Sequence, residues 1–248
     1  MFSNKLKSLA DNQNKSISRH IRETVETFVI AFVLAVLIKT FFFQIFYIPS
    51  GSMIPTLMIK DRLVVIKPYY GIQNPLFNAK HKKTFLYVIP NPLYKVNIPF
   101  SNTKYVIDFK NPLKRFDVVV FYPPEEPVEG AIHFYTENTF RKVTYFRPPQ
   151  KPGSDYIKRI IGLPGEIIEV KDGYIYVNGK KIDESKHLLI RDEDNFGPIK
   201  IPAKSFFAMG DNRPRSSDSR IWGFLPAENI VGKAIFKIWP VTRIGPII

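Results

Sequence analysis

The amino-acid sequence contains no cysteine among its 248 residues. Without a thiol, the chain forms no disulfide bond, offers no thiolate nucleophile and holds no zinc through cysteine ligands. This absence does not decide the compartment, because an extracytoplasmic domain of this size can fold without disulfides. Covalent acyl chemistry would therefore have to use a serine or threonine hydroxyl.

Histidine is also scarce, with four residues in the chain. A serine at its ordinary pKa is inert and needs a base, for which histidine is the usual partner. His20 lies in the polar N-terminal region, and the other three lie in polar or irregular stretches without a catalytic-looking motif: His81, His133 and His187. The sequence gives little support to a Ser–His triad, so another base has to be sought.

Acidic residues are outnumbered, since 36 Lys and Arg face 22 Asp and Glu for a net charge of +14. A basic balance suits nucleic acid or anionic lipid. The charges are spread along the chain, and neither a zinc-finger spacing nor an aromatic RNA-binding signature is present. We therefore expect contact with membrane lipids and no nucleic-acid partner.

No metal or cofactor site is expected either. The acidic run "RDEDN" (191–195) lacks a recognisable ligand spacing, and a loop is the better interpretation.

Proline and aromatic residues are plentiful, with 21 Pro, 21 Phe and 12 Tyr. Stretches rich in β-branched residues predict strands at 62–70, 116–122, 167–182 and 234–241. The dipeptides Asp172-Gly173 and Asn178-Gly179 predict hairpin turns, so 166–200 is expected to be a hairpin-rich β insertion. The fold class is therefore mainly β, built from antiparallel sheets. The sequence does not predict which secondary structure residues 68–114 adopt.

One long apolar run, Phe28 to Ile38, follows a basic N-terminal region. The stretch 24–46 spans 23 residues with charges only near its ends, and about 20 residues cross the hydrocarbon of a bilayer. The sequence therefore predicts a basic cytoplasmic tail (1–22), a single transmembrane helix (23–46) and an extracytoplasmic domain (47–248). A cleavable signal peptide stays open as an alternative, since Ser50 and Ser52 mimic small residues at −3 and −1.

Two serines stand one residue apart where the apolar run ends, in "IPSGSMIPTL" (48–57). With histidine poorly placed, lysine is the alternative base, and it must be neutral to act. Burial in an apolar site lowers the pKa of a lysine. Lys158 in "DYIKRIIGLPGE" (155–166) is a lysine embedded in apolar residues, on a predicted strand with Tyr156 and Ile160 on its own side. Taken alone, this stretch is equally typical of an ordinary strand whose lysine points to solvent.

A third block, "MGDNRPRSSDSRIWGFLP" (209–226), crowds polar and charged residues between apolar flanks. By itself this block is typical of a polar loop with Asx turns. As part of a site, it could hold a base and a strand in place.

Taken together, these blocks resemble the bacterial type I signal peptidases, which are membrane-bound Ser/Lys endopeptidases. The resemblance runs through nearly the whole chain in order. The N-terminal anchor leads into "PSGSMIPTL" and "KRFDVVVF" (114–121), followed by "YIKRIIGLPGE" and the 209–226 block. It implies a signal-peptidase-like β domain with a single N-terminal transmembrane helix in the bacterial cytoplasmic membrane.

The resemblance assigns roles residue by residue. Ser52 matches the nucleophile and Lys158 the general base, while Ser50 and the Ser52 N–H match the oxyanion hole. Supporting positions match Ser216, Asp211, Arg213, Asp218 and Arg220. Positions that line the shallow substrate pockets match Ile48, Pro49, Met53, Leu57, Tyr156 and Ile157. The substrates implied are preproteins that carry signal peptides, with no cofactor.

One departure from the family pattern is Phe116, where the third block usually has glycine. Three other functions compete with this one. An S-x-x-K serine acyltransferase rests on a match at Ser101–Lys104 that reads as loop then strand, without a following K-T-G. A Ser/Lys peptidase of narrow or self-cleaving specificity and a membrane-tethered, non-catalytic β binding domain stay open as alternatives.

Overall fold

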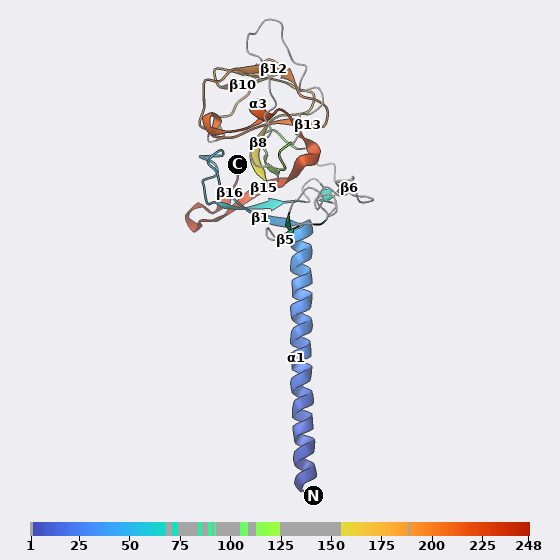
Figure 1. Ribbon diagram of the computed structural model, residues 1–248. Coiled ribbons are helices and arrows are strands. Elements are labelled where there is room, and N and C mark those ends of the chain that lie inside the picture. Colours follow the sequence, from blue (N-terminus) through green and yellow to red (C-terminus); the bar gives the residue numbers. More distant parts are fainter. Residues whose placement is uncertain are drawn as a thin grey trace. The chain divides into compact units, whose positions relative to one another are not determined.

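The computed structural model describes residues 2–67, 71–73, 84–85, 89–90, 92, 105–108, 113–124, 155–187 and 189–248. The chain divides into two compact units, Met1–Phe42 and Phe43–Ile248, and each is described by itself (Figure 1). The S-x-x-K match at 101–104 and two of the histidines, His81 and His133, lie outside the described residues.

Helix α1 (Phe2–Phe41) makes up the first unit. Two ion pairs with helical i,i+4 spacing lie on it, Arg19 with Glu23 at 2.9 Å and Arg22 with Glu26 at 3.0 Å. Large apolar side chains follow from Phe28 to Ile38, and they are between 44% and 72% exposed. An apolar helix surface of this kind needs a partner or a lipid phase to cover it.

The helix does not follow the boundaries that the sequence predicts for a membrane anchor. It begins inside the predicted tail and ends at Phe41, and strand β1 (Phe43–Tyr47) replaces the last turn of the predicted span. The end of the span at residue 46 is therefore wrong, because Phe43–Tyr47 alternates exposed and buried residues and pairs with the next strand. Among the described residues, no helix combines the length and the apolar character needed to cross a membrane.

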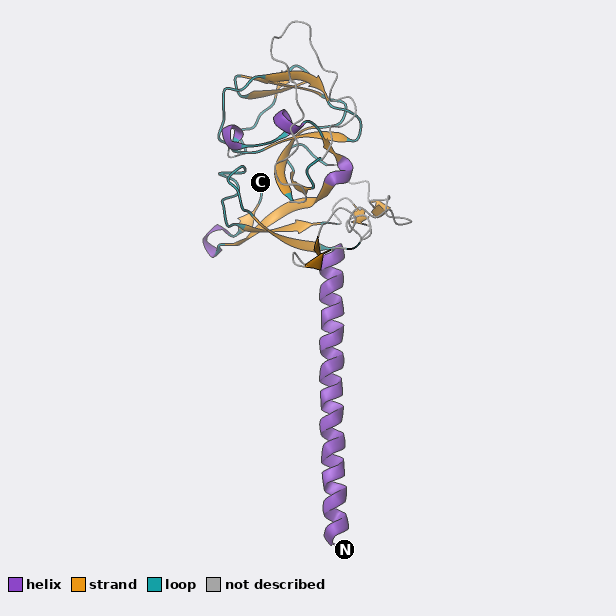
Figure 2. Ribbon diagram, in the orientation of Figure 1, coloured by secondary structure: helices purple, strands orange, loops and turns teal. Residues whose placement is uncertain are grey.

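An eight-stranded antiparallel sheet forms the centre of the second unit (Figure 2). Its strands follow the order β1-β2-β15-β7-β8-β13-β14, with β16 paired to β15. Their bounds are β1 (Phe43–Tyr47), β2 (Arg62–Ile66), β7 (Val118–Phe121), β8 (Tyr156–Gly162), β13 (Ser205–Met209), β14 (Leu225–Pro226), β15 (Ile230–Trp239) and β16 (Gly245–Pro246). Strand β8 lies in the interior of this sheet, between β7 and β13.

A second antiparallel sheet of four strands has the order β11-β10-β9-β12. Its strands are β9 (Ile167–Lys171), β10 (Tyr174–Val177), β11 (Lys180–Lys181) and β12 (Phe196–Lys200). Both predicted turns have positive φ at their two central residues, as hairpin turns of this length require: 48° and 73° at Asp172-Gly173, and 50° and 77° at Asn178-Gly179. Two small ladders complete the described strands, β3 (Gly71–Gln73) with β6 (Tyr105–Asp108), and β4 (Thr84–Phe85) with β5 (Ile89–Pro90).

Three clusters of buried apolar side chains fill the second unit. One of them includes Met53 and Leu57, which tie the segment after β1 to the main sheet. Another includes Ile160 of β8, Ala208 of β13 and Trp222 of the short helix α3 (Ser219–Trp222). The first of these clusters holds residues 48–57 in place, and the other packs β8 against Trp222 and Leu225 in the second half of the 209–226 block.

The mainly antiparallel β fold expected from the sequence is confirmed. The predicted strands at 116–122 and 234–241 correspond to β7 and β15, and the run 191–195 is a loop. The described part of the chain also contains three 3-10 turns: η1 (Arg213–Arg215), η2 (Ala227–Asn229) and η3 (Val241–Arg243).

Candidate active site

Ser52 lies on a compact turn that follows β1. Backbone hydrogen bonds close the turn, from Ile54 N to the Gly51 carbonyl at 3.2 Å and from Leu57 N to the Met53 carbonyl at 2.8 Å. Met53 and Leu57 are fully buried, so the turn is fixed to the core by its own side chains. Ser52 itself is 9% exposed. The hydroxyl therefore stands on a rigid backbone.

Lys158 reaches this hydroxyl from β8. Its Nζ donates a hydrogen bond to Ser52 Oγ at 2.8 Å and another to the Ile157 carbonyl at 3.0 Å. The Nζ also lies 5.8 Å from the centre of the Tyr156 ring. The side chain is 4% exposed, on a strand covered by neighbours on both sides. Residues 106 positions apart in sequence are thus brought into hydrogen-bonding contact.

Burial lowers the pKa of Lys158 to about 8, against the smaller opposing effects of the Asp218 and Asp211 carboxylates. An amine with this pKa is neutral in about a tenth of the molecules at pH 7, far more than at the ordinary pKa of lysine. A neutral amine has a lone pair that can accept the proton of a hydroxyl at this distance. The pair can therefore act as nucleophile and base.

Residues 210–212 contact the turn that carries Ser52 and form hydrogen bonds with its backbone. Asn212 N donates to the Ser52 carbonyl at 3.0 Å, and Asn212 Nδ2 donates to the Gly51 carbonyl at 3.1 Å. Ser216 is buried beside Gly210, and no described residue forms a hydrogen bond with its hydroxyl. The 209–226 block therefore packs directly against the turn that carries Ser52.

Gly210 has room for no side chain. A Cβ at this position would lie 2.3 Å from Ser216 Oγ and 2.5 Å from the Ser52 carbonyl oxygen. We expect Gly210→Ala to displace the turn and lower kcat by about 10²-fold, because misplacement by about 1 Å has that effect. Gly245→Ala is the matched control, since nothing lies within 4 Å of its Cβ position. Equal kcat for the two variants in a peptide-cleavage assay would contradict the packing argument.

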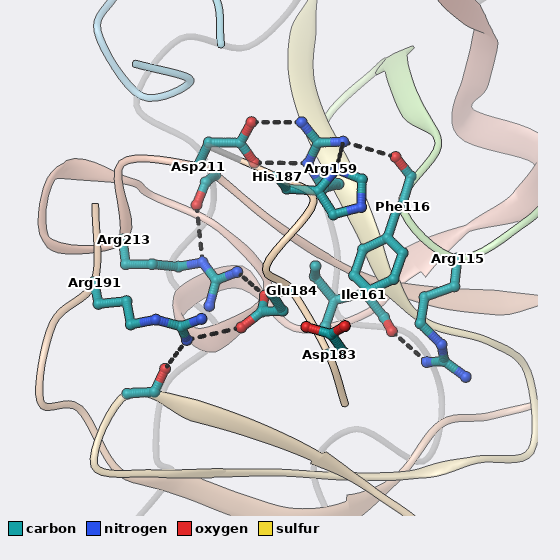
Figure 3. A network of polar contacts seen from close by, with 12 residues as sticks. Arg115, Phe116, Arg159, Ile161, Asp183, Glu184, His187, Arg191, Asp211 and Arg213 are labelled. Atoms are coloured by element: carbon teal, nitrogen blue, oxygen red, sulfur yellow. Dashed lines mark hydrogen bonds and ion pairs between the residues drawn. The ribbon is translucent and has the colours of Figure 1, made fainter. Parts of the chain in front are cut away.

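The residue after the lysine anchors the site through a buried ion pair (Figure 3). Arg159 binds Asp211 with two hydrogen bonds, from Nε at 2.8 Å and from Nη2 at 2.7 Å, and both side chains are at most 1% exposed. Arg159 also donates to the carbonyl oxygens of Phe116 and Ile248, each at 3.0 Å. This ion pair fixes β8 to the segment that carries Asn212.

Two further clusters of charge extend from the 209–226 block. Arg213 donates to the Gly210 carbonyl at 3.2 Å and forms a buried ion pair with Glu184, which also binds Arg191 (Figure 3). Arg220 binds Asp218, Asp192 and Asp194. Asp218 accepts a hydrogen bond from Gly210 N and caps the first turn of α3. The supporting residues that the sequence predicts are therefore all in the folded block around residue 210.

The residues expected to line substrate pockets differ in exposure. Pro49 is exposed, as is Ser50, the residue expected in the oxyanion hole, and Tyr156 and Ile157 are half-buried. Ile48, Met53 and Leu57 are buried in a core cluster. Burial also raises the pKa of the Tyr156 hydroxyl. The exposed and half-buried members are the ones that a substrate can reach in this arrangement.

Phe116 stands where the resemblance leads one to expect glycine, and its φ of 73° is in the left-handed region that glycine favours. Its amide donates to the Ile160 carbonyl at 2.7 Å, and its carbonyl accepts from Arg159. The phenyl ring packs on the His187 ring with centroids 4.4 Å apart. The backbone hydrogen bonds and the ring contact thus stabilise Phe116 in a conformation that glycine adopts more easily.

Sequence reasoning missed Arg159 and Glu184 as supporting residues. Arg159 stands beside Lys158 in a quoted motif, and a charged residue on an interior strand could have signalled a buried partner. Glu184 gave no signal, because it lies in a polar loop far along the sequence from the block that it contacts.

His187 lies 3.3 Å from Arg159, and its pKa is lowered by burial and then by that guanidinium. The described residues include no cluster of three or more potential metal ligands.

Comparisons with known proteins show the family of the chain. A family model described as "Signal peptidase, peptidase S26" matches residues 21–239. The chain is 32% identical over 227 residues to a signal peptidase I of Leptolyngbya laminosa, covering 91% of this chain and 83% of the relative. It is 32% identical over 223 residues to a probable signal peptidase I-2 of Synechocystis sp., covering 90% and 75%. It is 27% identical over 246 residues to a signal peptidase I of Bacillus licheniformis, covering 95% and 98%.

Proposed function

Because the chain belongs to the signal peptidase family, peptidase S26, and is a hydrolase of the signal peptidase I type, we propose that Ser52 and Lys158 are the residues with which it removes signal peptides. The observation that carries this proposal is the 2.8 Å contact between Lys158 Nζ and Ser52 Oγ, with both residues buried. A non-catalytic binding domain is therefore not retained as an alternative.

Acylation begins when neutral Lys158 takes the proton from Ser52 Oγ. The oxygen attacks the carbonyl carbon of the scissile peptide bond, and a new C–O bond forms. As the tetrahedral intermediate collapses, the C–N bond breaks and the lysine ammonium gives its proton to the leaving amine. The signal peptide is then held on Ser52 as an ester, and Lys158 is neutral again.

Deacylation uses the same two residues, with Lys158 again as the base and Ser52 now as the leaving group. Lys158 takes a proton from a water molecule, the water oxygen attacks the ester, and Ser52 Oγ leaves with the proton that Lys158 returns. In both steps, negative charge develops on the carbonyl oxygen of the substrate. The Ser52 N–H and the exposed Ser50 hydroxyl are the donors that we propose for this oxyanion.

The substrate is proposed to be a preprotein whose signal peptide binds as an extended strand. Main-chain hydrogen bonds would then supply affinity, and shallow pockets would select small residues at −1 and −3. The half-buried Tyr156 and Ile157, which precede Lys158 on β8, are accessible to such a strand. The direct test incubates the detergent-solubilised chain with a preprotein and sequences the N-terminus of the product. A preprotein left uncut by the folded protein would refute the proposal.

Activity should depend on pH through Lys158. With a pKa of about 8, the active neutral amine is a minority below pH 8 and the majority above it. We expect kcat/KM to rise about tenfold per pH unit up to about pH 8 and then level off. Stability should rise with pH between about 8 and 10.4, because there the unfolded lysine holds a proton that the buried one has lost. A kcat/KM that falls as pH rises from 6 to 8 would be incompatible with a lysine base.

Membrane attachment is proposed for the first unit. The large apolar side chains of α1 between Phe28 and Ile38 are exposed, and a bilayer would cover them. The basic residues before them favour a cytoplasmic N-terminus, which would place the second unit on the outer face. This topology puts the proposed catalytic pair on the side where a signal peptide emerges.

One face of the main sheet carries residues that suit contact with lipid headgroups. In the strand register, Tyr47 lies opposite Arg62 and Arg62 opposite Trp239, so the three share one face. Tyr47 is 53% exposed and Trp239 is 52% exposed. Exposed aromatic side chains beside a cation are typical of surfaces that meet lipid headgroups.

The topology can be tested because the chain has no cysteine. Single variants Ser3→Cys and Ala203→Cys, the second at an exposed position, are treated with a membrane-impermeant maleimide in right-side-out vesicles. We expect Ala203→Cys to react at once and Ser3→Cys to react only after the vesicles are opened. Reaction of Ser3→Cys before opening and of Ala203→Cys only afterwards would show the reverse topology. Recovery of the protein in the soluble fraction would exclude membrane attachment.

A further inference from the structure

Asn212 forms hydrogen bonds with two successive peptide groups of the catalytic turn. Its side-chain Nδ2 donates to the Gly51 carbonyl at 3.1 Å, and its backbone N donates to the Ser52 carbonyl at 3.0 Å. We propose that Asn212 is a positioning residue that aims the Ser52 N–H at the oxyanion of the transition state. This inference rests on the proposed function, in which that N–H is an oxyanion donor.

The argument follows from the planarity of the peptide group. The Gly51–Ser52 bond is not among the cis peptide bonds of the chain, so its C=O and N–H point in opposite directions. A hydrogen bond that holds the Gly51 oxygen on one side therefore fixes the direction of the Ser52 N–H on the other. That N–H makes no hydrogen bond to any residue in the described part of the chain, and it is free to meet a substrate oxygen.

The second hydrogen bond fixes the next peptide plane. The Ser52 carbonyl belongs to the Ser52–Met53 peptide, and Asn212 N holds it. The planes on both sides of the Ser52 Cα are thus set by one residue. Rotation of the turn about this Cα would break one of these two bonds. The Ser52 Oγ and the Ser52 N–H are therefore kept in a fixed relation to each other.

Asn212 is itself rigidly held. It is 4% exposed, and its carbonyl accepts a hydrogen bond from Arg215 N at 3.0 Å. The residues on either side of it bind Ile190, through Ile190 N to the Asp211 carbonyl and Arg213 N to the Ile190 carbonyl, each at 2.9 Å. Asp211 also carries the buried pair with Arg159. The Nδ2 donor is consequently preorganised.

This role differs from that of Lys158. Asn212 donates to main-chain oxygens, and neither of its two contacts with the turn involves Oγ or Nζ. Loss of the side-chain donor should weaken stabilisation of the oxyanion while leaving the base and its proton transfer intact. Binding that occurs equally in the ground state and the transition state should be unaffected.

The test uses Asn212→Ala, which removes the donor, and Asn212→Asp, which keeps the shape but places an acceptor against the Gly51 carbonyl. Asn229→Ala is the matched control, because Asn229 Nδ2 donates to the Tyr122 carbonyl at 3.0 Å away from the catalytic turn. The full solubilised chain is assayed for kcat and KM on a signal-peptide substrate. The dissociation constants of a peptide boronic acid and of the cleaved product peptide are measured alongside.

We expect both Asn212 variants to lose about 10- to 100-fold in kcat, since an oxyanion donor misdirected rather than removed should cost less than a deleted one. KM and product affinity should stay within twofold. The affinity for the boronic acid, which forms a tetrahedral adduct on Ser52, should fall in parallel with kcat/KM. The pH midpoint near 8 should not move. Asn229→Ala should match the parent chain in all of these quantities.

Unchanged kcat in Asn212→Asp, with the parent chain active, would overturn the inference and leave the proposed function intact. Equal loss of product and boronic acid affinity would also overturn it, because a general loosening of the site would then be the cause. An inactive parent chain would instead refute the proposed function. If Asn212→Ala unfolds below the assay temperature in a thermal melt, the isosteric Asn212→Asp decides the question.

Discussion

Replacement of Lys158 by methionine should lower kcat/KM for preprotein cleavage by about 10⁴-fold and leave the chain folded. Methionine has a similar length and suits the apolar surroundings of β8, so the 4% exposed position should accept it. The variant lacks the lone pair that, in the proposed mechanism, takes the Ser52 proton, and loss of a general base that acts in both steps has an effect of this size. The measurement is the rate of mature product formation by the solubilised chain.

Lys171→Met is the matched control for this change. Lys171 is an exposed residue of β9 whose ion pair with Glu169 lies on the surface of the second sheet. Its replacement should alter kcat/KM by less than twofold and should leave the pH profile unchanged. If Lys158→Met kept more than a tenth of the parent activity, Lys158 would not be the general base.

The second large effect concerns the ion pair between Arg159 and Asp211. Arg159→Met leaves a carboxylate buried at 1% exposure without its bidentate partner, and we expect the free energy of unfolding to fall by about 3–5 kcal/mol. The double variant Arg159→Met/Asp211→Leu removes both charges and should recover most of that loss, because the burial cost of the carboxylate disappears with it. Urea denaturation of the four members of this double-mutant cycle gives the coupling energy.

A partly exposed pair, Lys171 at 54% exposure with Glu169 at 20%, gives the reference for this cycle. Removal of the Lys171–Glu169 pair should change the free energy of unfolding by less than about 1 kcal/mol, because solvent screens it. A double variant as unstable as Arg159→Met alone would show that the loss comes from packing rather than from an unpaired charge.

Much of the fold could be predicted because its signals are local. The Asp172-Gly173 and Asn178-Gly179 turns specify hairpins by their own conformational preferences, and the alternation in 167–182 predicts which faces are buried. The order of strands in the main sheet could not be predicted in this way. It depends on pairings such as β15 with β2 and β7, which join distant parts of the chain.

The end of the N-terminal helix shows the limit of counting apolar residues. Four of the five residues in Phe43–Tyr47 are apolar or aromatic, but Gln44 is buried while Phe43, Ile45 and Tyr47 are exposed, an alternation typical of a strand. The competition between a last helical turn and pairing with β2 is decided by tertiary contacts. A hydropathy argument alone contains no information about that competition.

The candidate site was predictable where a motif carried it. The sequence singled out Ser52 and Lys158 from residue chemistry and resemblance, and the fold brings their side chains to 2.8 Å. The sequence did not indicate Glu184, because its carboxylate reaches Arg213 from a separate loop. The positioning by Asn212 was equally hidden, since it depends on which carbonyl its amide meets.

The most direct measurement of the central claim compares the two serines of the turn in one preprotein-processing assay. The parent chain, Ser52→Ala and Ser50→Ala are incubated with the same substrate, and the mature product is quantified over time. Ser52→Ala should form no product above the level without enzyme, whereas Ser50→Ala should retain cleavage slowed by about 10²- to 10³-fold, as the loss of one oxyanion donor does. Cleavage by Ser52→Ala at a rate comparable to that of the parent chain would contradict the account.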